Sequence, residues 1–111
     1  MSSAERNPRY PLDTAKLLVD RDACDISLSA VDGIYALGLT IEDAWLAIRA
    51  LSQPDFRKSM SSEKAPGTMQ DVYETMCGKH QIYLKIQVVA SRHTGNQILR
   101  LVSFKRNEHF S

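Results

Sequence analysis

The chain has 111 residues with a formal net charge of +1, and 43% of its residues are hydrophobic. This length suits one domain with one core, and the hydrophobic content is too high for an intrinsically disordered chain. Binding to a polyanion would therefore have to come from a local cluster of charge, such as the basic last third of the chain, and not from the chain as a whole.

Cysteine and histidine usage argues against a disulfide framework and against a metal centre. Cys24 and Cys77 are too few for a disulfide-stapled fold, which favours a reducing, cytoplasmic setting. The three histidines lack the spacing of a ligand set, and no CxxC or HExxH motif occurs. The first residues contain no apolar signal-peptide segment, and no apolar run approaches membrane-spanning length. We therefore expect a cytoplasmic protein without a cofactor.

The first half of the chain has the apolar periodicity of helices. We expect a mobile leader over residues 1–11, helices over residues 12–20, 29–37 and 41–51, and a short edge strand over residues 26–28. Residues with a preference for helix ends support these bounds. Asp13 or Thr14 is the expected cap of the first helix, Ser29 of the second and Thr40 of the third, and Gly38 ends the second helix.

After Pro54 the period of the apolar residues changes to two, which is typical of strands. Strands are predicted over residues 56–61, 69–73, 80–89 and 97–105. The segments between them contain turn residues, with Gly78 in one turn and Gly95 in a hairpin loop. This order predicts a single α+β domain over residues 1–111, with N-terminal helices on one face of a C-terminal antiparallel sheet and a tail over residues 106–111.

The predicted strand over residues 80–89 has the clearest alternation. Its apolar side carries Ile82, Leu84, Ile86 and Val88, and its other side carries Tyr83, Lys85 and Gln87. If the hairpin pairs Val89 with Gln97, Tyr83 faces Ser103 and Lys105 lies diagonal to Tyr83 on the same face. The same register places Arg100 on the core face, which indicates a sheet edge or a bulge at that point.

Four segments in the second half resemble the MqsR toxins of bacterial toxin–antitoxin systems, which belong to the RelE-like ribonucleases. The segments are, in order, LSQPDFRKSM, MQDVY, IYLKI and LVSFK. The resemblance covers residues 51–105 and is weaker over residues 12–51. It implies a RelE-like fold and a metal-independent, sequence-selective mRNA endoribonuclease that acts as a type II toxin and inhibits translation. It also implies two partners, the mRNA substrate and a dedicated antitoxin, often a zinc-containing repressor with a helix-turn-helix domain.

Carried over by motif, the catalytic residues of this family fall on Lys58, Gln70, Tyr83 and Lys105, and Lys85 and Arg106 are expected to bind RNA. Their chemistry suits RNA cleavage, in which a 2′-hydroxyl attacks the adjacent phosphorus. Lysines stabilise the developing charge, an amide orients the strand, and a tyrosine passes a proton. The neighbouring ammonium groups are expected to favour the phenolate form of Tyr83. The chain departs from the family pattern at Met69 and Glu74, where an aromatic and a basic residue are common.

Each of these residues has an ordinary structural explanation when it is considered alone. Lys58 and Lys105 suit solvated strand positions that guard a sheet edge, and Tyr83 suits a half-buried strand position. Only their joint appearance in the order of the family favours an enzyme. The alternative is a non-catalytic RNA- or protein-binding module on the same fold.

Overall fold

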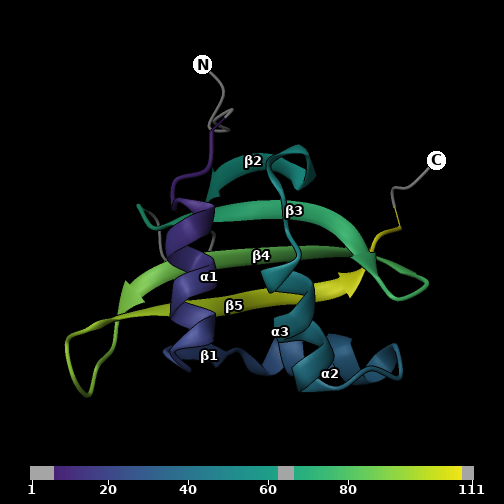
Figure 1. Ribbon diagram of the computed structural model, residues 1–111, viewed down its shortest axis with the longest axis horizontal. Helices are drawn as coiled ribbons and strands as arrows, with labels where there is room; N and C mark the ends of the chain where they lie inside the picture. Colours follow the sequence, from purple (N-terminus) through teal and green to yellow (C-terminus); the bar gives the residue numbers. More distant parts are fainter. Residues whose placement is uncertain (1–6, 63–66, 109–111) are drawn as a thin grey trace.

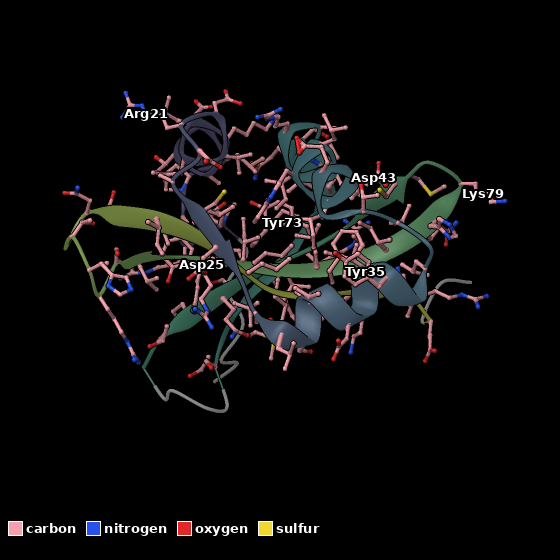
Figure 2. The ribbon with its side chains drawn as sticks, turned by 90° about the horizontal axis from the view of Figure 1, so that it is seen from below. Arg21, Asp25, Tyr35, Asp43, Tyr73 and Lys79 are labelled. Carbon is pink, nitrogen blue, oxygen red and sulfur yellow. The ribbon has the colours of Figure 1, made fainter. Side chains whose placement is uncertain are left out.

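The computed structural model describes residues 7–62 and 67–108 (Figure 1). Its elements follow in the order α1 (Leu12–Asp20), β1 (Cys24–Ile26), α2 (Leu28–Ala36), α3 (Ile41–Arg49), the short 3-10 helix η1 (Gln53–Asp55), β2 (Phe56–Ser61), β3 (Met69–Cys77), β4 (His80–Ala90) and β5 (Gln97–Arg106). Helices α1 and α3 cover one face of the sheet, and α2 packs along β5 (Figures 1 and 2). The predicted α+β fold is confirmed. None of the described helices is long and apolar enough to cross a membrane.

The strands form one five-stranded sheet in the order β1-β5-β4-β3-β2. Strands β2 to β5 pair antiparallel, as the sequence after Pro54 predicts. The short strand predicted over residues 26–28 lies instead at Cys24–Ile26, and it pairs parallel to β5 at the edge of the sheet. It ends before residue 27 because Ser27 already caps the following helix.

The start of α3 and the end of α2 have the predicted caps. Thr40 Oγ1 accepts a hydrogen bond from the backbone N–H of Asp43 at 3.1 Å, and the Asp43 carboxylate accepts one from the N–H of Thr40 at 2.8 Å. This reciprocal pair satisfies two groups that lack partners within the helix. Gly38 follows the last turn of α2 with a φ of 74°, a conformation that glycine adopts without steric cost.

Two predicted caps are wrong. Helix α2 begins one residue earlier than predicted, and Ser27 rather than Ser29 caps it, because Ser27 Oγ accepts a hydrogen bond from the first turn at 3.1 Å. Helix α1 has the predicted bounds, but no side chain caps it, so Asp13 and Thr14 do not have the predicted role. Pro11 occupies the N-cap position there, and its ring carries no hydrogen-bond acceptor.

Asp71 of β3 ties the N-terminal segment to the sheet. Its buried carboxylate accepts hydrogen bonds from the backbone N–H groups of Arg9 and Tyr10, each at 2.9 Å, and the Tyr10 hydroxyl donates to the carbonyl of Met69 at 2.9 Å. A carboxylate can be buried only when such donors replace water. The leader predicted to be mobile is therefore anchored at residues 9 and 10. Residues 1–6 of that leader and 109–111 of the predicted tail lie outside the described residues.

A bulge in β5 sets the register of the β4–β5 hairpin. The pairs on the face away from the core are, starting from the hairpin loop, Val89–Ile98, Gln87–Arg100, Lys85–Ser103 and Tyr83–Lys105, with the shift between the second and third pairs. The predicted pairing of Val89 with Gln97 is wrong, because the loop closes one residue further on. Beyond the bulge, Lys105 lies directly opposite Tyr83 and not diagonal to it. The bulge also explains Arg100, which lies away from the core.

Gly33 allows α2 to lie against the backbone of β5. A Cβ atom added at Gly33 would meet the carbonyl oxygen of Phe104 at 1.8 Å. Real Cβ atoms do not approach backbone oxygens so closely, so any side chain there must push the helix away from the strand. Phe104 is itself a buried core residue, only 1% exposed, and this contact therefore fixes α2 to the core as well as to the strand.

We expect Gly33→Ala to destabilise the protein by about 1–3 kcal/mol, the usual cost of overpacking. The sign of the change in the free energy of unfolding is informative, because a glycine-to-alanine substitution inside an ordinary exposed helix stabilises the protein by up to about 1 kcal/mol. Urea unfolding of the variant, beside Asp32→Ala on the exposed side of the same helix, measures the difference. A Gly33→Ala variant as stable as the parent would contradict the close approach of α2 to β5.

Candidate functional site

The sheet face opposite α1 and α3, hereafter the polar face, carries all four predicted catalytic residues. The strand register places a first row of side chains across β2–β5 that consists of Lys58, Val72, Lys85 and Ser103. The next row, nearer the Gly78 turn, consists of Glu74, Tyr83 and Lys105. The row on the hairpin-loop side contains Met60, Gln70, Gln87 and Arg100. Because neighbours within a row share a face, these side chains project from the same side of the sheet.

Three of the four predicted catalytic residues meet in one pocket. Its volume is about 340 Å³, and it is lined by Lys58, Tyr83, Lys105, Arg106, Asn107 and Glu108. The ammonium nitrogen of Lys105 lies 5.4 Å from the centre of the Tyr83 ring, and that of Lys85 lies 5.8 Å from it. These distances are within the range of cation–π attraction. Two cations are thereby held beside one phenol.

Gln70 does not line this pocket. It lies two rows of side chains away from Tyr83. Two rows are four residues along a strand, a separation of about 13 Å. Its side chain is almost covered and lines a neighbouring hollow of about 700 Å³, together with Lys85. The structure thus brings Lys58, Tyr83 and Lys105 together and leaves Gln70 beside them along the same face.

The electrostatic environment of Tyr83 differs from the prediction. Burial of the phenol, and then the carboxylate of Glu74 directly opposite it on β3, raise the pKa of Tyr83 above its usual value. The expectation that Lys85 and Lys105 would favour the phenolate is therefore wrong. Both ammonium groups lie near the ring. The carboxylate of Glu74 is also near, and it disfavours a second negative charge on the phenol oxygen. Tyr83 remains a proton donor at neutral pH.

Glu74 and Asn107 belong to the site, although no sequence pattern assigned either of them a role in it. The Glu74 carboxylate accepts a hydrogen bond from Arg57 Nε at 2.6 Å and another from the side-chain amide of Asn107. Asn107 also lines the Tyr83 pocket, and its backbone N–H donates to the carbonyl of Gln81 at 2.9 Å. These contacts hold the end of β5 against β3 and fix one wall of the pocket.

The described residues contain no group of three or more histidine, cysteine or acidic side chains placed to hold a metal ion. The polar groups around the pocket are instead ammonium and guanidinium groups, a phenol, an amide and the single carboxylate of Glu108. Cations of this kind bind phosphate, and a phenol between them can deliver a proton to an oxygen bound there. The arrangement therefore suits binding of a phosphodiester and general acid chemistry on it.

Comparisons with known proteins agree with this chemistry. A family model described as “Motility quorum-sensing regulator, toxin of MqsA” matches residues 7–106, a range that contains every predicted site residue. A curated relative, “mRNA interferase toxin MqsR” of Escherichia coli (strain K12), is 34% identical over 85 residues, which cover 77% of this chain and 87% of the relative. The resemblance found in the sequence is confirmed, and the chain belongs to the MqsR toxin family.

Proposed function

We propose that this chain, a toxin endoribonuclease of the MqsR family, cleaves mRNA without a metal ion at the pocket of Lys58, Tyr83 and Lys105. The observation that carries the proposal is the meeting of two lysines and a protonated tyrosine in one concave site. Cleavage of a phosphodiester in such a site needs no Lewis acid, because fixed cations supply the charge stabilisation.

The reaction follows from the chemistry of RNA. The 2′-hydroxyl gives up its proton to solvent and attacks the neighbouring phosphorus, a 2′,3′-cyclic phosphate forms, and the bond to the 5′-oxygen of the next nucleotide breaks. Lys58 and Lys105 bind the non-bridging oxygens and stabilise the extra negative charge of the transition state. Tyr83 donates its proton to the departing 5′-oxygen, a role for which its raised pKa keeps it in the correct form.

The other predicted residues bind and orient the strand. Gln70, which lies along the face from Tyr83, positions the RNA through its amide and does not touch the reacting phosphate. Lys85 lies between Gln70 and the Tyr83 pocket and binds the backbone there. Arg106 binds it at the opposite end of the pocket. Backbone contacts of this kind position a strand without reading its sequence.

The family description names MqsA as the counterpart of the toxin, which implies an antitoxin partner. We propose that the antitoxin of this chain contains zinc and a helix-turn-helix domain, that the pair is a type II system, and that the toxin inhibits translation in the cytoplasm as a single domain. The identity of the reading frame beside the gene tests the proposed antitoxin. A small gene with two CxxC motifs and a helix-turn-helix pattern supports it, and a neighbour without them counts against it.

Tyr83→Phe is expected to lower single-turnover cleavage by roughly 10²–10⁴-fold, the scale for loss of a general acid. The ring and its packing remain, so stability should change by no more than about 1 kcal/mol and RNA binding should persist. Tyr35→Phe is the matched control, because Tyr35 is exposed on α2 and does not line the pocket. A folded Tyr83→Phe variant with parental activity would refute the role of the hydroxyl. RNA binding without cleavage by the parent chain would favour the non-catalytic binding module.

Tyr83 is expected to ionise only above the ordinary tyrosine pKa of about 10. The protonated phenol is the active form, so its contribution should persist through neutral and mildly alkaline pH and be lost as the pH rises past the raised pKa. Tyrosinate absorbance, titrated for the parent and for Tyr83→Phe, isolates this group in the difference between the two curves. Ionisation of Tyr83 below the ordinary value would show that the lysines dominate its environment after all.

Chelation of divalent ions should leave cleavage intact. The proposed stabilising charges are the ammonium groups of Lys58 and Lys105, which a chelator does not remove. The measurement is cleavage of one defined transcript with and without chelator, beside a metal-dependent ribonuclease that shows the chelator to be effective. Activity that disappears with chelator and returns with a divalent ion would overturn the proposed mechanism.

A further inference from the structure

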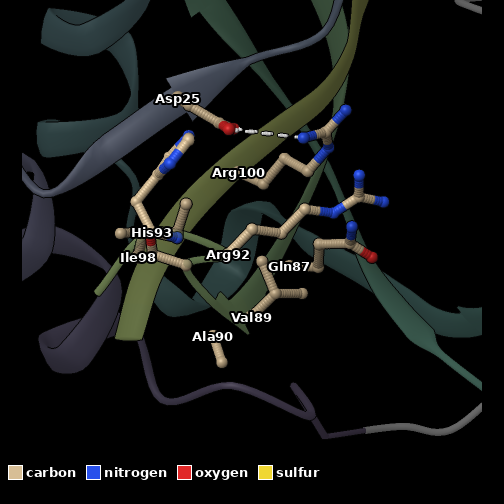
Figure 3. Close-up of a pocket in the computed structure, with 9 residues that line it drawn as sticks. Asp25, Gln87, Val89, Ala90, Arg92, His93, Ile98 and Arg100 are labelled. Atoms are coloured by element: carbon tan, nitrogen blue, oxygen red, sulfur yellow. Dashed lines mark hydrogen bonds and ion pairs between the residues drawn. The ribbon is translucent and has the colours of Figure 1, made fainter. Parts of the chain in front are cut away.

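A second polar hollow lies at the hairpin-loop end of the same face. Its volume is about 500 Å³, and the side chains that give it its chemistry are Asp25, Gln87, Arg92, His93 and Arg100 (Figure 3). None of these residues has a role in the cleavage chemistry proposed above. We refer to this hollow as the arginine pocket.

The hairpin loop holds its basic residues in place by internal hydrogen bonds. The backbone N–H of Ser91 donates to the carbonyl of Asn96 at 2.8 Å, and the N–H of Gly95 donates to the carbonyl of Ser91 at 2.9 Å. Ser91 Oγ also accepts a bond from the N–H of His93 at 3.2 Å. Arg92 lies within this closed loop, so the loop presents its side chain from a defined backbone.

The two arginines point the same way. Figure 3 shows the guanidinium groups of Arg92 and Arg100 extending to the same side as the amide of Gln87. Asp25 offsets one of the two charges through a contact of 3.3 Å to Arg100, between side chains that are 40% and 48% exposed. Two guanidinium groups on one side of a hollow repel each other, and an anion placed between them removes that repulsion.

The amide of Gln87 supplies a further indication of a ligand. Its carbonyl oxygen is covered and has no hydrogen-bond partner among the described residues. A covered polar atom without a partner is unfavourable, so this side chain gains stability if a donor enters the hollow. A ribose hydroxyl or the amino group of a base is such a donor.

The arginine pocket adjoins a hollow whose Lys85 side chain reaches the ring of Tyr83. Gln87, Arg92 and Arg100 also line the 700 Å³ hollow that contains Gln70 and Lys85. Lys85 in turn lies 5.8 Å from the ring of Tyr83. Successive rows on the face are about 7 Å apart along the strands, a step comparable to that between phosphates of an extended RNA strand. Cations spaced in this way form a groove that can follow a single-stranded backbone.

We propose that the arginine pocket binds a backbone phosphate and its nucleotide in the substrate RNA, at a position removed from the cleaved bond. Arg92 and Arg100 bind the phosphate oxygens, and the Gln87 amide contacts the ribose or the base. The proposal rests on the RNA-cleaving function proposed above and assigns these residues to substrate binding alone.

The test compares two arginine pairs. Arg92→Ala with Arg100→Ala removes the proposed contacts. Arg21→Ala with Arg49→Ala removes the same charge from the helix side, where Arg49 forms a matching exposed ion pair with Asp20 at 2.9 Å and where Figure 2 shows Arg21. Each double variant is assayed for binding to an RNA that carries a 2′-O-methyl group only at the nucleotide whose hydroxyl attacks, which blocks cleavage and leaves the other ribose hydroxyls free. Each is also assayed for single-turnover cleavage of two RNAs. One RNA reaches only the Tyr83 pocket, and the other extends across the whole face.

The arginine-pocket variant should bind the long RNA at least roughly tenfold more weakly than the parent. It should cleave the long RNA correspondingly more slowly when the RNA is subsaturating. Its rate at saturating RNA and its cleavage of the short RNA should match those of the parent. Its salt dependence of binding should be shallower by roughly 0.7 in the logarithmic slope for each phosphate that the variant no longer binds. The helix-side variant should match the parent. Equal effects of the two variants, or none, would overturn the subsite.

Two further outcomes separate this proposal from its basis. If the parent chain cleaves neither RNA, the proposed function fails, whereas the binding assay still decides whether the pocket holds RNA. If the arginine-pocket variant keeps full RNA affinity and loses affinity for the antitoxin alone, the pocket serves an acidic segment of that partner and the RNA subsite is refuted.

Discussion

The bulge in β5 determines which side chains reach the polar face. On its loop side, Leu99 and Leu101 are buried and Arg100 points away from the core, whereas beyond it Phe104 is buried and Lys105 lies opposite Tyr83. Side chains alternate along a strand, so without the extra residue one half of β5 would direct its charges into the core. A single inserted residue thus lets one strand supply both a continuous core and a continuous cationic surface.

Ser27 connects the bulge to the helical layer. Val102 is the residue without a partner in the β4–β5 ladder, and its carbonyl accepts a hydrogen bond from Ser27 Oγ at 2.6 Å. The same oxygen accepts the capping bond that starts α2. The backbone N–H of Ser27 also donates to the carbonyl of Leu101 at 3.0 Å. The start of a helix and the irregularity of a strand are therefore fixed by one residue, and Gly33 continues the contact along β5.

The charge balance of the chain conceals a separation between its two sides. The net charge is only +1, yet the acids concentrate in the helical half, whereas residues 79–108 contain six lysines and arginines against Glu108. Two acids at the polar face, Asp25 and Glu74, each contact an arginine. A cationic surface on a nearly neutral molecule attracts a polyanion to one side of it and so orients the encounter.

Local patterns predicted most elements, and the failures have physical causes. Helix Leu12–Asp20 and strand Phe56–Ser61 have the predicted bounds, because their periodicity and flanking residues agree. The position of the bulge could not be predicted from the pattern of apolar residues. Leu101 and Val102 are both apolar, so either could be the residue that faces the core. Cys24–Ile26 could not be placed, because its parallel partner is distant in the sequence. The family motifs supplied the site residues, and only the register shows which of them lie together.

The pKa of Tyr83 illustrates a signal that the sequence did contain. The strand predicted over residues 69–73 is too short to give Tyr83 a partner on its β3 side. The two-residue turn at Gly78 pairs Cys77 with His80, and counting back from that pair places Glu74 opposite Tyr83. The departure from the family pattern at Glu74 therefore adds to the effect of burial in raising the pKa of Tyr83.

The anchoring of the N-terminal segment by Asp71 has a practical consequence for how the chain is produced. Shortening the protein to the start of α1 would remove both backbone donors at Arg9 and Tyr10 from a carboxylate with no exposed surface. The damage would appear in the middle of β3, far along the sequence from the cut, because a buried carboxylate would lose two of the donors that replace water around it. Expression designs should therefore keep residues 7–11 and place any tag or cleavage site before them.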